Sequence, residues 1–142
     1  MSKIVVVKES YDSTYCPAER IAGPKDIVAL MAPKISNLDQ EEFWVISLNQ
    51  AGNVKACEMV SRGGLASSIV EPRGVFLRAV HNNAAAIVCA HNHPSGNPEP
   101  SADDVAVTRQ LVEAGRILGI PVRDHVIIAG NGWTSLAERG AV

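Results

Sequence analysis

The fold of this chain is decided by the stretch Ala84-Ala85-Ala86-Ile87-Val88-Cys89-Ala90-His91-Asn92-His93-Pro94-Ser95-Gly96. Its apolar residues, 84–90, follow one another without alternation, which is typical of a central strand that is buried on both faces. Residues 91–100 are rich in Pro, Gly and Asn and predict a loop. We therefore expect a central strand that ends just before two histidines.

A long helix and a further strand are predicted after this loop. Ser101 is a good N-cap residue, and apolar side chains recur at helical spacing from Val105 to Leu118. Gly119 suits the position just past the end of a helix, where the backbone turns left-handed. The apolar residues 121–129 predict the last clear strand, and Asn131-Gly132 predicts the last clear turn.

The residues before 84 supply the remaining elements. Strands are predicted at 3–9, 42–49, 54–61 and 66–70, with a loop at 10–23, a hairpin loop at 49–53 and a break at Gly63-Gly64. Helices are predicted at 24–34, where Pro24 and Asp26 favour a helix start, and at 71–81. These elements indicate a mixed sheet flanked by helices, of α/β or α+β class, in a single domain spanning residues 1–142.

The composition is that of an ordinary globular domain. Of the 142 residues, 46% are apolar and 20% are charged, with a formal net charge of -2. The basic excess of nucleic-acid binders is absent, and no stretch approaches the roughly 20 apolar residues that cross a membrane. Cys16, Cys57 and Cys89 are odd in number and widely spaced, which indicates no disulfide framework. We expect a cytoplasmic protein of undetermined oligomeric state.

The two histidines and the helix start carry the chemistry. His91 and His93 are two residues apart, so in an extended chain their side chains point the same way, about 6.6 Å apart. The loop then turns the chain back, and the first turn of the next helix can present Asp104 to the same point. Two imidazoles, one carboxylate and an open fourth position are the pattern of a catalytic Zn²⁺ site. Zinc makes a bound water acidic enough to supply hydroxide near neutral pH.

Such a site needs a base, which the residues alone do not identify. The residues of the site also have simpler structural interpretations. The residues do not rank the available carboxylates, which are Glu41, Glu42, Glu58, Glu71 and Glu99. Ser101 to Asp104 is also nearly a capping box, and a capping and a metal-binding role can coexist. His125, which follows Asp124 at a strand start, fits a partner behind a ligand, a substrate contact, or a core or edge histidine. Cys89 fits a small buried hydrophobe.

The run His91-Asn92-His93-Pro94, followed after a spacer by Ser101 and Asp104, resembles the JAMM motif of the JAB/MPN metalloprotease superfamily. Residues 91–98 are closer still to its bacterial RadC branch, and residues 84–88, 112–116 and 124–128 also resemble that branch. The resemblance covers roughly residues 37–136. It implies the cytidine-deaminase-like architecture of JAB/MPN domains, a mixed sheet wrapped by helices.

The resemblance also implies roles and a reaction. His91, His93 and Asp104 match the zinc ligands, and Ser101 matches the serine that stabilises the oxyanion. The family's acid/base Glu lies at a strand start, which makes Glu42 the candidate, with Glu41 pointing the opposite way if the chain is already extended there. The implied activity is that of a peptidase or isopeptidase, in which zinc-activated water attacks an amide carbonyl of an unknown peptide or protein substrate.

Two departures from the RadC pattern stand out. RadC chains usually carry an N-terminal helix-hairpin-helix module associated with DNA, and the first 36 residues are too few for it. They also commonly read His-Pro-Arg-Glu where this chain has Glu71-Pro72-Arg73-Gly74. Two alternatives stay open beside the hydrolase: a DNA-repair-associated RadC-type protein acting on or near DNA, and a non-catalytic interaction module. The letters His-Asn-His resemble HNH nucleases only superficially.

Overall fold

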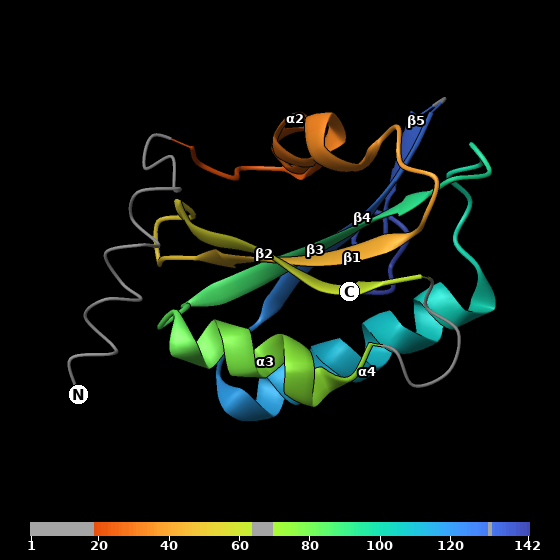
Figure 1. Cartoon of the computed structure of the whole chain (residues 1–142). Helices are drawn as coiled ribbons and strands as arrows, with labels where there is room; N and C mark the ends of the chain where they lie inside the picture. Colours follow the sequence, from red (N-terminus) through yellow and green to blue (C-terminus); the bar gives the residue numbers. More distant parts are fainter. Residues whose placement is uncertain (1–18, 64–69, 131) are drawn as a thin grey trace.

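The computed structural model describes residues 19–63, 70–130 and 132–142. In these residues a five-stranded sheet packs with helices in three layers (Figure 1). The helices are α2 (Pro24–Ile35), α3 (Pro72–His81) and α4 (Ala102–Leu118), and the strands are β1 (Glu42–Leu48), β2 (Val54–Arg62), β3 (Ala86–His93), β4 (Val122–Ala129) and β5 (Gly132–Ser135). The predicted mixed sheet flanked by helices is confirmed. No described helix has the length and hydrophobicity needed to span a bilayer.

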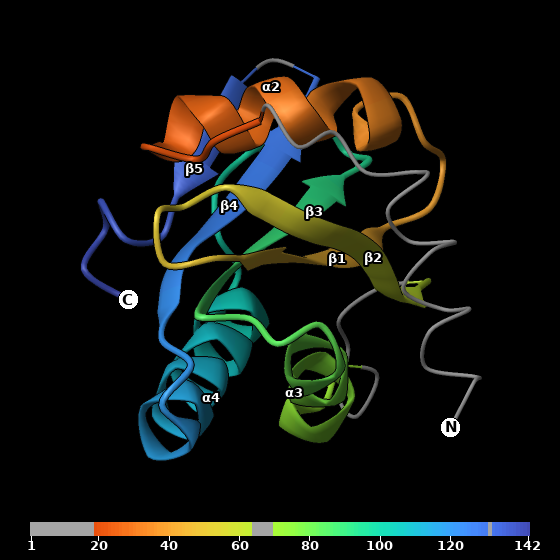
Figure 2. The same cartoon turned by 90° about the vertical axis from the view of Figure 1, so that its left-hand side faces the viewer.

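The sheet has the strand order β2-β1-β3-β4-β5, with β3 at its centre. β1 runs antiparallel to both β2 and β3, β3 runs parallel to β4, and β4 runs antiparallel to β5. Helix α2 covers one face of the sheet, while α3 and α4 cover the other (Figure 2). The parallel pair β3 and β4 is joined through α4, so the loop after β3 and the start of α4 lie at one end of the sheet.

The two faces of β3 enter two separate hydrophobic cores. Val88 and Ala90 pack with Ile27 and Met31 of α2 on one face. Ile87 and Cys89 pack on the other face in the core that α3 and α4 close. This arrangement explains the apolar run, because a strand covered on both faces needs apolar side chains at successive positions. The predicted role of Cys89 as a small buried hydrophobe is confirmed, and burial raises the pKa of its thiol.

Two elements differ from the sequence prediction. β3 does not stop before the histidines but continues through His93, because Phe43 of β1 pairs with His91 and Ala129 of β4 pairs with His93. β5 is an additional strand, and its short, mostly polar sequence gives no apolar run to predict it. The predicted strand at 3–9, most of the loop at 10–23 with Cys16, and residues 66–69 of the predicted strand at 66–70 lie outside the described residues. Val70 lies in a bend.

The helix ends follow the expected local rules. Ser101 is the N-cap of α4, and its hydroxyl oxygen accepts a hydrogen bond from the backbone N–H of Asp104. Gly119 follows the last turn of α4 with φ of 73°, a left-handed conformation that glycine adopts without strain. These two residues fix where α4 begins and ends relative to β3 and β4.

Gly115 provides a test of the packing of α4 against the turn that follows it and against α3. A Cβ at this position would overlap the carbonyl oxygen of Ile120 and lie 3.2 Å from Cζ of Phe76. We predict that Gly115→Ala lowers the free energy of unfolding by about 1–3 kcal/mol, because the backbone must move to relieve the overlap. Gly74→Ala is the control in α3, where the nearest atom to a new Cβ is 3.9 Å away.

The control substitution should stabilise the protein by about 0.5–1 kcal/mol, since alanine favours the helix more than glycine does. Urea unfolding curves of the two variants measure both effects. Stabilisation of similar size in both variants would contradict the close approach of α4 to Ile120.

Candidate metal centre

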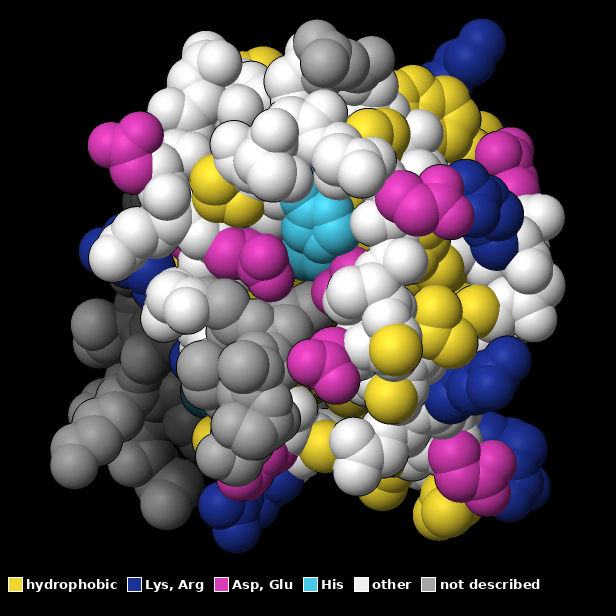
Figure 3. Space-filling model, turned by 90° about the vertical axis from the view of Figure 1, so that its right-hand side faces the viewer, with side chains coloured by type: hydrophobic (Ala, Val, Ile, Leu, Met, Phe, Trp, Pro, Cys, Tyr) yellow, Lys and Arg dark blue, Asp and Glu magenta, His cyan; other side chains and the backbone are white. Residues whose placement is uncertain are grey.

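The end of β3 and the start of α4 bring two imidazoles and a carboxylate together. His91 Nε2 lies 3.2 Å from His93 Nε2 and 3.2 Å from Asp104 Oδ1. His93 Nε2 lies 3.1 Å from Asp104 Oδ2. The space-filling view of this end of the molecule shows a histidine side chain at the surface with acidic side chains around it (Figure 3).

These distances fit the ligand spacing of a tetrahedral ion. Metal bonds of about 2.0–2.1 Å in a tetrahedron place the ligand atoms about 3.3 Å apart. The distance between the two histidine nitrogens comes within a few tenths of an ångström of that value, and so does the distance from each of them to its nearer Asp104 oxygen, Oδ1 for His91 and Oδ2 for His93. Glu41 joins them, and one ligand atom from each of the four residues lies within 4.8 Å of the others. The group could therefore hold a metal ion.

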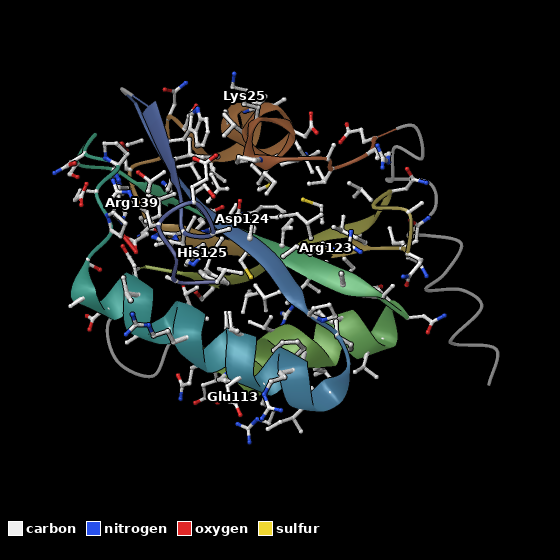
Figure 4. The ribbon with its side chains drawn as sticks, turned by 180° about the vertical axis from the view of Figure 1, so that it is seen from behind. Lys25, Glu113, Arg123, Asp124, His125 and Arg139 are labelled. Carbon is white, nitrogen blue, oxygen red and sulfur yellow. The ribbon has the colours of Figure 1, made fainter. Side chains whose placement is uncertain are left out.

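Hydrogen bonds to the outer nitrogens orient the histidines. His93 Nδ1 lies 2.8 Å from the carbonyl oxygen of Asn97, which can only accept, so the Nδ1 atom carries the proton. The lone pair of His93 Nε2 is then directed toward the centre. His91 Nδ1 lies 2.7 Å from Nε2 of His125, a fully buried residue of β4 (Figure 4). Burial holds the pKa of His125 well below its usual value, which keeps its imidazole neutral.

Asp104 serves the helix and the centre at once. The Ser101 N–H donates to Asp104 Oδ2 at 2.8 Å, which completes the capping box. Burial alone would raise the pKa of the Asp104 carboxyl, but the neighbouring imidazoles of His91 and His93 and the backbone N–H of Ser101 hold that pKa well below its usual range. The group is therefore a carboxylate, as a metal ligand must be. The Ser101 hydroxyl accepts at the cap, which leaves its proton available to donate.

The structure places Glu41, and not Glu42, with the histidines. Because Phe43 pairs with His91 and side chains alternate along a strand, Glu41 shares a face with the ligands and Glu42 points to the opposite face. Glu42 accepts hydrogen bonds of 2.9 Å from Trp44 Nε1 and of 2.9 Å from Arg62 Nε. Glu42, which was expected to act as acid and base, therefore lies outside the group, and Glu41 lies within it. The sequence showed that Glu41 and Glu42 would point to opposite faces of a strand. It did not show which of the two faces carries the histidines, because that depends on how β1 pairs with β3.

The other carboxylates considered from the sequence are bound elsewhere. Glu58 accepts from Asn82, Glu71 pairs with Arg73, and Glu99 pairs with Arg139. The described group around His91 includes none of these three.

Asn92 holds the segment that carries Glu41, and sequence reasoning missed it. Its side chain is 1% exposed, accepts from the backbone N–H of Glu42 at 2.7 Å and donates to the carbonyl oxygen of Gln40 at 3.0 Å. These two bonds fix the backbone on both sides of Glu41. The available signal was a polar residue between the two histidines that follow the apolar run 84–90.

Removing the Asn92 amide should cost stability. We predict that Asn92→Ala lowers the free energy of unfolding by about 1–3 kcal/mol, because the buried N–H of Glu42 loses its acceptor. The exposed Asn97 is the control, since Asn97→Ala should stay within about 0.5 kcal/mol. Denaturant unfolding of the metal-free variants makes the comparison. Equal small losses would mean that the Asn92 bonds do not hold this segment.

The chain is similar to known proteins over most of its length. A family model described as the RadC-like JAB domain matches residues 21–141. A UPF0758 protein from Salinibacter ruber is 54% identical over 123 residues, covering 87% of this chain and 53% of the relative. UPF0758 proteins from Moorella thermoacetica (50% identical; 84% of this chain and 52% of the relative) and Symbiobacterium thermophilum (45%; 84% and 51%) are also similar. The chain thus spans about half the length of these relatives. It belongs to the family of RadC-like JAB domains.

Proposed function

We propose that this chain is a zinc-dependent hydrolase that cleaves an amide bond of a peptide or protein, as a peptidase or isopeptidase. The observation that carries the proposal is the convergence of His91, His93 and Asp104 at tetrahedral ligand spacing with Glu41 beside them. The family membership supports it, because JAB domains include metallohydrolases.

His91, His93 and Asp104 would hold the metal, and the donor set suits zinc. Two imidazole nitrogens and one carboxylate oxygen form the three-ligand set of catalytic zinc sites, and the fourth position stays open for water. Zinc bound in this way lowers the pKa of that water to about 7 and polarises a carbonyl oxygen.

Two further side chains would act on the reacting atoms. The Glu41 carboxylate would remove a proton from the attacking water and return it to the nitrogen of the leaving amine. The available proton of Ser101 would be donated to the substrate oxygen that becomes negative when the carbonyl carbon is attacked. The strand register supports Glu41, in place of Glu42, as the proposed base.

The other functions considered from the sequence have less support. A net charge of -2 and the carboxylates of Glu41 and Asp104 at the centre disfavour binding of phosphate groups. An interaction module would not need a complete set of metal-binding side chains. We place the protein in the cytoplasm, because the free thiols of Cys57 and Cys89 suit a reducing compartment.

Metal content tests the zinc site. We expect about one zinc ion per purified wild-type chain, as in other three-ligand sites, and loss of most of it in Asp104→Ala. Asp103→Ala is the matched control, since Asp103 lies on the same helical turn outside the group and should keep the metal. Elemental analysis after purification without chelators gives the result. A wild-type chain without zinc would leave the interaction module as the leading function.

Hydrolysis tests the assignment of the base. We expect Glu41→Gln to lower the cleavage rate of a peptide library by about 10²–10⁴-fold, because proton transfer loses its carrier, while zinc stays bound. Glu42→Gln is the control and should retain most of the activity, since its carboxyl faces Trp44 and Arg62. Mass spectrometry of the library follows both variants. Cleavage that persists with a zinc chelator would contradict the metal mechanism.

A further inference from the structure

A buried row of three side chains leads from α4 through β4 to the candidate metal centre. Thr108, His125 and His91 each have an exposed fraction of 0%. Thr108 Oγ1 lies 2.5 Å from His125 Nδ1, and His125 Nε2 lies 2.7 Å from His91 Nδ1. The row approaches His91 from the side opposite the group, so it uses the nitrogen that does not face Asp104.

The hydrogen-bonding capacity of these groups restricts where their protons lie. A neutral imidazole carries one N–H, and a hydroxyl carries one proton. Thr108 Oγ1 also lies 2.7 Å from the carbonyl oxygen of Asp104, which can only accept. When the hydroxyl donates to this carbonyl, it accepts from the Nδ1–H of His125. His125 Nε2 then accepts from the Nδ1–H of His91.

In this arrangement the Nε2 lone pair of His91 faces His93 and Asp104. The reverse arrangement has the Thr108 hydroxyl donating to His125 and His125 donating to His91. It places a proton on His91 Nε2, where a metal ligand needs a lone pair. The direction of the row therefore decides whether His91 can bind a cation.

We propose that Thr108 and His125 are positioning residues that hold His91 in the Nδ1–H form and thereby set the metal affinity of the centre. This inference rests on the proposed zinc site and deepens it. The rings are also fixed by packing, because Phe43 stacks on His91 with centroids 5.9 Å apart and meets His125 edge-on at 5.2 Å. The hydrogen bond from the Thr108 hydroxyl to the Asp104 carbonyl determines the direction of every hydrogen bond in the row.

Zinc affinity tests the role of the hydroxyl. Thr108→Val keeps the shape of the side chain but leaves His125 Nδ1 without an acceptor, and we expect zinc to bind about 10–100-fold more weakly. Thr108→Ser retains the hydroxyl and should bind zinc as the wild type does. Competition with a chromophoric chelator measures the affinities, and thermal unfolding of the metal-free proteins verifies that both variants fold. Wild-type affinity in Thr108→Val would overturn the inference.

A second readout does not need zinc. Nitrogen-15 NMR of the imidazoles at alkaline pH, where histidines are neutral, should show both His91 and His125 as Nδ1–H forms in the metal-free wild type. An Nε2–H form of His91 would overturn the inference. If the chain binds no zinc but His91 and His125 are both in the Nδ1–H form, the proposed function is refuted and the role of Thr108 and His125 in orienting His91 is supported. The two failures are thus distinguishable.

Discussion

The antiparallel pairing of β1 with β3 is the constraint on which the candidate centre depends. Phe43 lies opposite His91, and this register brings Glu41 to the face that carries both histidines. A slip of one residue would exchange Glu41 for Glu42, because side-chain direction alternates at each position. The Asn92 amide reinforces this register by binding the backbone on both sides of Glu41, and the bonds from Trp44 and Arg62 hold the Glu42 side chain on the opposite face.

The start of α4 supplies the second half of the centre through an ordinary helix cap. The bonds between Ser101 and Asp104 that satisfy the first backbone groups also fix the direction of the Asp104 carboxylate. A negative charge at this position is favoured by the helix dipole. Two imidazole lone pairs and the carboxylates of Glu41 and Asp104 lie close together at this end of the sheet. A cation bound between them would stabilise this cluster of acceptors. The interactions that stabilise the fold therefore hold these acceptors together, in an arrangement that suits a bound metal ion.

The sequence predicted the elements that depend on local pattern. The apolar run at 84–90, the cap at Ser101 and the glycine at 119 each reflect a rule that acts within a few residues, and the described elements agree with them. Features set by pairing between distant strands were not accessible. The choice of Glu41 over Glu42, the extension of β3 through His93 and the clamp by Asn92 all depend on which strands are neighbours and in which register.

Differences in burial determine from which side the centre can be reached. The His91 side chain is 0% exposed and is backed by His125, whereas the His93 side chain is 13% exposed. Ser101 is exposed and Glu41 is half-buried, so both groups proposed to act on a substrate lie toward solvent with His93. A peptide substrate of the proposed hydrolase would therefore reach the centre from the side of His93 without disturbing His91. In the proposed function, the buried side of the centre would fix proton positions and geometry, and the exposed side would admit the substrate.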